Sequence, residues 1–131
     1  MARRYISTGS KWEALAGYSR AVVDGRDIFV SGTVGFDRAT GELADGAVAQ
    51  AEAAIDTIEW ALGEAGATLR DIVRVRVFIP DRADVEAITR VVARRIGPAH
   101  AANTTICAAL PVENAKVEIE VTARRDVASA T

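Results

Sequence analysis

Two side-chain types that often carry catalysis near neutral pH occur once each in the chain, and both lie in the stretch HAANTTICAALP, residues 100–111. They are His100, which could act as a general base, and Cys107, which could act as a nucleophile. No Asp or Glu lies close enough to His100 in sequence to orient its ring, and no neighbour of Cys107 would lower the pKa of its thiol. We therefore expect a structural or solvated histidine and a buried, inert thiol.

The sequence also argues against metal, phosphate and nucleic-acid sites. One histidine and one cysteine make no closed set of ligands, so we expect no metal. The glycines of GTVGFDRATGEL, residues 32–43, lack the spacing of a phosphate-binding loop, and we interpret this stretch as a connection between a strand and a helix. Trp12 and Trp60 are not interleaved with basic residues, as they would be in a platform for stacking bases.

Charge and composition narrow the class of protein. The chain has 16 basic and 18 acidic residues and a net charge of −2, so we expect no general attraction to the phosphates of a nucleic acid. Half of the residues are apolar and 26% are charged, values typical of a soluble globular protein, and 131 residues predict one domain over 1–131. No segment approaches the roughly 20 apolar residues of a membrane span, and no signal peptide is evident. With a single cysteine, we expect a cytoplasmic protein.

Two helices are predicted from apolar residues at spacings of three and four. The first covers residues 45–66, with an apolar stripe formed by Val48, Ala51, Ile55, Ile58, Leu62 and Ala65. The second is capped by Asp81 or Asp84 and ends at Gly97-Pro98. Three arginines lie toward its end, where cations suit the helix dipole: Arg90, Arg94 and Arg95. We favour that explanation over an RNA-binding patch.

Alternating apolar residues predict strands. A hairpin is expected over residues 19–32, turning at Asp24-Gly25. Residues 72–79 place four apolar side chains on one face: Val73, Val75, Val77 and Ile79. Residues 116–124 alternate in the same way, and a further strand begins near Thr104. The order of elements predicts an α+β fold in which two helices pack on one face of a mixed sheet.

The opposite face of this sheet has no cover within the chain. It would carry Arg74, Arg76 and Phe78 on one strand, with Glu118 and Glu120 on another. If the two strands are neighbours, their opposite charges can pair across the ladder, but Phe78 stays uncovered. A face that is polar and partly apolar favours self-association, so we expect a homo-oligomer with cyclic symmetry.

Three blocks in order resemble the Rid/YjgF family of reactive-intermediate deaminases, formerly called L-PSP endoribonucleases. They are GYSRAVVDGRDIFVSGTVGFDRATGEL, QAEAAIDTIEWALGEAGATLRDIVRVRVFIPD and ANTTICAALPVENAKVEIEVTA, and the match runs from about Tyr5 to Arg125. The resemblance implies a chorismate-mutase-like fold, a homotrimer with small-molecule pockets between subunits, and no metal or organic cofactor. The best-understood members of this family hydrolyse small enamines or imines to a 2-oxo acid and ammonia.

The resemblance also implies site residues. It assigns catalytic roles to Tyr18 and Glu118, and substrate contacts to Gly32 and to backbone groups near Cys107. The arginine that binds the substrate carboxylate in active deaminases falls on Asn103. Because a neutral amide lacks the charged, bidentate fork of arginine, we expect weaker carboxylate binding, by about 1 to 3 kcal/mol, and an altered choice of substrate.

Two cations could replace the missing arginine. Arg20 lies two residues after Tyr18 and would share its face of an extended strand, although it could equally pair with an acid across the hairpin. His100 lies three residues before Asn103 but is only partly charged at neutral pH. Three functions remain open: an imine deaminase of altered substrate choice, a non-catalytic binder of carbonyl or carboxylate metabolites, and, less favoured, an endoribonuclease.

Overall fold

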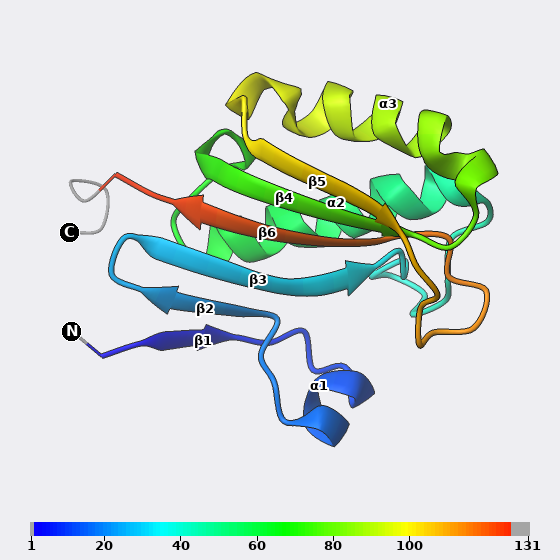
Figure 1. The fold of residues 1–131 in the computed structure, drawn as a ribbon. Coiled ribbons are helices and arrows are strands. Elements are labelled where there is room, and N and C mark those ends of the chain that lie inside the picture. Colours follow the sequence, from blue (N-terminus) through cyan, green and yellow to red (C-terminus); the bar gives the residue numbers. More distant parts are fainter. Residues whose placement is uncertain (1, 127–131) are drawn as a thin grey trace.

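The computed structural model describes residues 2–126 and contains one six-stranded mixed sheet, shown in Figure 1. The strands lie in the order β1-β2-β3-β6-β4-β5. Their bounds are Arg4–Ile6 for β1, Ala21–Asp24 for β2, Asp27–Val34 for β3, Ile72–Ile79 for β4, Ala102–Cys107 for β5 and Glu118–Arg124 for β6. All neighbours pair antiparallel except β4 and β5, which are parallel. The α+β prediction is therefore confirmed.

Both long helices pack on the same face of the sheet, as predicted (Figure 1). They are α2, Ala47–Glu64, and α3, Val85–Ile96, and a short helix α1, Lys11–Ala16, lies beyond the ends of β1 and β2. Short 3-10 turns cover Leu69–Asp71, Arg82–Asp84 and Gly97–Ala99. The core between helices and sheet is aliphatic and includes Ile28, Ile55, Ile58, Leu62, Ile72, Val75, Val77, Ile79, Ile88, Ile119 and Val121. No helix within residues 2–126 is long and apolar enough to cross a bilayer.

Two details of the predicted faces were wrong. Val48 is exposed, and Gln50 is buried instead, because its side chain bonds to the backbone of the segment before β6, at Asn114 and Lys116. Val73 is also exposed, because the pairing of β4 with β6 shifts register between Ile72 and Arg74. Val73 is the extra residue of this bulge and has no partner on β6, so Ile72 and Val75 both face the core and Val73 does not.

The arginines of α3 have a structural role. Nη1 of Arg95 donates to Glu52 of α2 at 2.6 Å, and its Nη2 donates to Asp56 at 2.9 Å. Arg94 also pairs with Glu52, and Arg90 pairs with Glu86 one helical turn earlier. The pairs of Arg94 and Arg95 connect α3 to α2, and the pair of Arg90 lies within α3, which supports the structural explanation of the arginine cluster.

The second face of the sheet is open in the single chain. Arg76 and Glu120 lie opposite each other and pair at 3.5 Å, whereas Arg74 lies opposite Thr122. Phe78 is partly buried, and three large apolar side chains on the same face are exposed: Tyr5, Phe29 and Ile106. Their cross-strand partners place them on this face, since directly paired residues share one side of a sheet.

Candidate functional site

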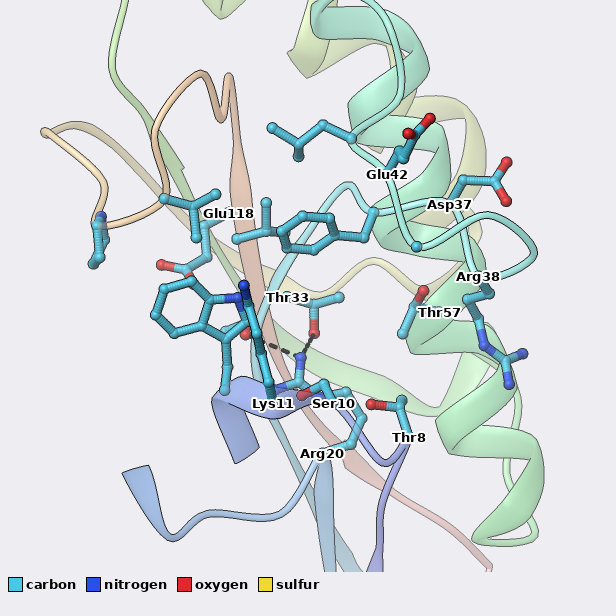
Figure 2. Close-up of a pocket in the computed structure, with 18 of the residues that line it drawn as sticks. Thr8, Ser10, Lys11, Arg20, Thr33, Asp37, Arg38, Glu42, Thr57 and Glu118 are labelled. Atoms are coloured by element: carbon cyan, nitrogen blue, oxygen red, sulfur yellow. Dashed lines mark hydrogen bonds between the residues drawn. The ribbon is translucent and has the colours of Figure 1, made fainter. Parts of the chain in front are cut away.

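A cavity of about 1300 Å³ lies beside the end of β3 (Figure 2). One wall comes from α1 and the turns around it, including Trp12 and Tyr18, and another comes from the loop that follows β3. Thr57 of α2 and the start of β6 contribute further wall residues. Segments distant in sequence therefore enclose one space that is open to solvent.

Four of the residues predicted for a site line this cavity together. They are Tyr18, Arg20, Gly32 and Glu118. Tyr18 and Arg20 precede β2, Gly32 lies within β3, and Glu118 begins β6. The pairing of β3 with β6, which is irregular between Val30 and Thr33, brings Gly32 beside Glu118.

Gly32 is required for this close approach. A Cβ atom at this position would lie 3.0 Å from both Cδ and Oε2 of Glu118. That is tighter than nine in ten real contacts of a Cβ atom, so a larger residue would push the carboxyl group aside. The glycine thus keeps the Glu118 side chain flat against β3.

Glu118 is the titratable group of the cavity with a raised pKa. Burial raises the pKa of its carboxyl, the positive charge of Arg20 lowers it, and the neighbouring Glu120 raises it again. The net direction is upward, because partial burial disfavours the charged form. A carboxyl of this kind exchanges protons closer to neutral pH than an ordinary surface glutamate.

Arg20 lies almost fully buried at the back of the cavity, with 7% of the residue exposed. Its Nη1 donates to the carbonyl of Gly32 and to Oγ1 of Thr33, both at 3.3 Å (Figure 2). Its Nε lies 3.7 Å from Oε2 of Glu13, and the Tyr18 ring centre lies 5.4 Å from its Cζ. Neither Nε nor Nη2 has a hydrogen-bond acceptor among the described residues, although both atoms are buried.

Glu13 fixes the segment that carries α1. Its carboxylate accepts hydrogen bonds from Ser7 Oγ at 2.8 Å, from the Thr8 amide at 3.2 Å and from Ser10 Oγ at 3.2 Å. Burial alone would raise the pKa of Glu13, but the bonds from Thr8 and Ser7 and the charge of Arg20 lower it. The carboxylate therefore stays ionised while 4% exposed and balances part of the charge on Arg20.

The short helix α1 and its caps were not predicted, although the sequence carries a signal for them. Ser10 caps the helix by accepting from the Glu13 amide, and the pattern Ser-x-x-Glu is that of a capping box. Gly17 ends the helix in the left-handed conformation, at φ 72°. These caps position Trp12 at the cavity wall, with the Lys11 ammonium 5.5 Å from its ring centre.

Asn103 and Cys107 do not line this cavity. Asn103 pairs with Val75, whose side chain faces the helices, so the amide of Asn103 points toward α3. There it lies in a groove of about 120 Å³ and accepts a hydrogen bond from Thr105 Oγ1 at 2.9 Å. On the side of β5 shared with Glu118, the chain instead presents Ala102, Thr104 and Ile106.

The structure also places the remaining residues of the 100–111 stretch. Cys107 is exposed, so the prediction of a buried thiol was wrong; it lies on the edge strand β5, all six residues of which are exposed. His100 is exposed in the left-handed conformation, at φ 54°, as expected of a solvated histidine. Among residues 2–126, no three His, Cys, Asp or Glu side chains are grouped so that they could bind a metal ion.

Comparison with known proteins gives matches over nearly the whole chain. The profile of the family described as Endoribonuclease L-PSP matches residues 8–125. The chain is 36% identical over 127 residues to a 2-iminobutanoate/2-iminopropanoate deaminase of Capra hircus, covering 94% of this chain and 90% of the relative. The human protein of the same name is 34% identical over 125 residues, covering 92% and 89%.

A solved structure also matches the chain over most of its length. A Mycobacterium tuberculosis protein described as a member of the highly conserved YjgF/YER057c/UK114 family superposes with a TM-score of 0.86 at 36% identity. The match covers 94% of this chain and 99% of that protein. Every residue that lines the 1300 Å³ cavity lies inside the matched range 8–125.

Proposed function

Because the chain belongs to the Rid/YjgF family, described as Endoribonuclease L-PSP, we propose that it is an enamine/imine deaminase that hydrolyses small reactive imines to carbonyl compounds and ammonia. The observation that carries this proposal is the partly buried Glu118 carboxyl, with its raised pKa, in a cavity that also holds Tyr18 and Arg20. Two relatives named as imine deaminases support the reaction class.

The reaction needs one group that both accepts and donates protons. Glu118 accepts a proton from water as the oxygen adds to the carbon of the protonated imine, and it then donates that proton to the nitrogen of the tetrahedral intermediate. The carbon–nitrogen bond then breaks and ammonia leaves while the Glu118 carboxylate accepts the hydroxyl proton. That proton passes to the ammonia or to water, so the products are a carbonyl compound and ammonium. A raised pKa suits both steps, because proton transfer is most efficient when the pKa lies near the working pH.

Tyr18 and Gly32 complete the proposed site of one chain. The Tyr18 ring lines the cavity with 40% of the residue exposed, so its hydroxyl is available to orient the attacking water or the substrate. Gly32 allows the Glu118 carboxyl to lie against β3. Contacts from the backbone of Cys107 would have to come from a neighbouring chain, and the proposal does not depend on them.

The altered choice of substrate was expected from the replacement of arginine by Asn103. Within one chain Asn103 faces α3, and Arg20 is a cation that lines the cavity, so a changed anion-binding group still supports an altered choice of substrate. We also propose that the protein is a cytoplasmic homotrimer in which the open face of the sheet is covered by neighbouring chains. The exposed Tyr5, Phe29 and Ile106 on that face support the assembly.

The test is ammonia release from imines that an amino-acid oxidase generates in the same cuvette. We expect the protein to accelerate release over buffer, and we expect Glu118→Gln to lower the enzymatic rate by about 100-fold or more, as loss of a general acid-base does. If the wild-type protein gives no acceleration over a panel of aliphatic and aromatic imines, the proposal is wrong.

A second function is favoured by one observation, the unpartnered donors of Arg20 in an open cavity. These could serve a non-catalytic binder of carbonyl or carboxylate metabolites. Shifts of the melting temperature with such ligands, without turnover of any imine, would support the binder over the deaminase. Cleavage of RNA that persists after rigorous removal of contaminating nucleases would instead favour the endoribonuclease function.

A further inference from the structure

We propose that Arg20 is the anion-binding group of the cavity and that it holds the carboxylate of the ligand at the back of the cavity, beside Gly32 and Thr33. The identity of the ligand as a 2-imino acid rests on the proposed function. The binding of a carboxylate rests on the contacts of Arg20 itself, and it would hold equally for a protein that binds without catalysis.

The unpartnered atoms of Arg20 point to a missing acceptor. Both Nε and Nη2 are inaccessible to solvent and have no acceptor among the described residues. Leaving charged N–H groups buried without acceptors is unfavourable, because the bonds that water would make are lost and not replaced. An anionic ligand would supply a charged acceptor to Nη2, whereas Nε already has the Glu13 carboxylate 3.7 Å away.

The contacts that Arg20 already makes hold its guanidinium in place. Nη1 is bound by the Gly32 carbonyl and by Thr33 Oγ1, and the Glu13 carboxylate lies 3.7 Å from Nε. The oxygens of Glu13 also accept bonds from the segment before α1, so Glu13 fixes Arg20 without offering a short, direct bond. A guanidinium fixed on one side loses little freedom when a ligand binds the other side.

The position of Arg20 relative to Glu118 fits a ligand in which a carboxylate and a reacting carbon are adjacent. Arg20 donates to the Gly32 carbonyl, while the Glu118 carboxyl lies against the Cα of the same residue. In a 2-imino acid the carboxylate carbon is bonded directly to the imine carbon. A carboxylate on Arg20 would therefore direct the imine carbon toward Glu118.

Access to Nη2 requires a side chain to move. The Tyr18 ring lies 5.4 Å from the guanidinium carbon and is 40% exposed, so it can rotate without opening the core. We infer that the ligand displaces this ring and that the tyrosine then covers the bound carboxylate. Binding of a carboxylate should accordingly change the environment of Tyr18, which its ring NMR signals would report.

The experiment compares two stable probes, 2-oxobutanoate and the neutral 2-oxobutanamide, by isothermal titration calorimetry. We expect the wild-type protein to prefer the carboxylate, Arg20→Gln to lose that preference with at least a tenfold loss of 2-oxobutanoate affinity, and Arg20→Lys to be intermediate. Arg90→Gln removes an equal charge from the exposed surface of α3 and should leave both affinities unchanged. A preference retained in Arg20→Gln, or absent from the wild-type protein, would overturn the inference.

A paired set of variants keeps the test decisive if Arg20→Gln does not fold. Glu13→Gln leaves Arg20 in place and should keep the preference for the carboxylate, whereas Glu13→Gln/Arg20→Met removes the buried pair together and should abolish it. Equal preference in both folded variants would contradict the inference. This experiment measures binding without turnover. A negative result would overturn carboxylate binding by Arg20 and leave the deaminase proposal intact, whereas absence of imine hydrolysis would overturn the deaminase proposal and leave carboxylate binding intact.

Discussion

The carboxyl of Glu118 combines its proposed chemical role with a cost in stability. Its pKa is raised mainly by burial, so the folded protein binds its proton more tightly than the unfolded chain does. Below the ordinary pKa of 4.5 the carboxyl is protonated in both the folded and the unfolded protein, so it does not lower the free energy of unfolding. As the pH rises through the raised pKa, the folded state must hold a desolvated charge, and stability is lost.

Glu118→Gln should therefore be more stable than the wild-type protein at pH 7 and close to it at pH 4. A neutral amide of the same shape removes the buried charge but keeps the packing against Gly32. Thermal unfolding of the two proteins at both pH values measures the difference, and the same samples report the loss of ammonia release. A variant less stable than the wild-type protein at pH 7 would mean that the charge of Glu118 is well compensated.

Gly32→Ala should lower activity more than it lowers stability. The added methyl group would meet the end of the flexible Glu118 side chain, which can swing away at little cost, but the carboxyl then leaves its position on β3. We expect the rate of imine hydrolysis to fall at least tenfold, with a loss of stability of about 1 kcal/mol. Gly63→Ala is the matched control, because nothing lies within 4 Å of the new methyl group and alanine favours the helix.

Single residues of the candidate site could be predicted from the resemblance to a family, but not from local pattern. The resemblance to a family led to Tyr18, Gly32 and Glu118, which the structure brings together in one cavity. Asn103 was assigned by its position in the sequence motif. The side of β5 on which its side chain lies depends on the register of β5 with β4, and local sequence patterns do not determine this register. The exposure of Cys107 depends in the same way on β5 being an edge strand.

Among the elements, α1 and the segment before it form one wall of the cavity, and hydrogen bonds to the Glu13 carboxylate hold this segment in place. The segment from Ser7 to Ser10 folds around this carboxylate, and α1 begins where the segment ends. Glu13→Ala would leave the hydroxyl donors and the Arg20 guanidinium without their buried acceptor. Breaking a buried ion pair from one side costs about 3–5 kcal/mol, so we expect a large loss of stability in chemical denaturation.

Glu13→Gln is a smaller change than Glu13→Ala, and it tests the hydrogen bonds around Glu13 through the dependence of stability on pH. The pKa of Glu13 is lowered in the folded state, so its charge contributes stability that is complete above the usual pKa of 4.5. That contribution is lost as the pH falls through the lowered pKa. The wild-type protein should be more stable than Glu13→Gln at pH 7, and the gap should narrow steadily below pH 4.5. A gap that does not depend on pH would show that the ionised form is not what stabilises α1.

Long periodic elements were predicted well, and their irregularities were not. The two helices and the central strands follow from the spacing of apolar residues, and the YjgF-like fold is confirmed by the solved relative. The bulge beside Val73 and the buried side-chain bonds of Gln50 arise from contacts with β6 and the segment before it. Such tertiary contacts override the local pattern, and the three residues of β1 are too few to show a period.

For the whole molecule, the open face of the sheet predicts that copies of the chain assemble. The face carries exposed Tyr5, Phe29 and Ile106, while the helices cover the opposite side. Apolar side chains gathered on a face that is otherwise polar are typical of an interface between copies of a chain. We expect a mass in solution of three times the 13.9 kDa of one chain.

Phe29→Glu should dissociate this assembly. Phe29 is 49% exposed at the centre of the open face, between Val22 of β2 and Thr122 of β6, so a charge there would be desolvated by a neighbouring chain. Val48→Glu places the same charge at a similarly exposed apolar residue of α2, on the helical side, and should leave the mass unchanged. Light scattering after size-exclusion chromatography distinguishes the outcomes. If Phe29→Glu keeps the wild-type mass, or if the wild-type protein is a monomer, the open face is not the interface.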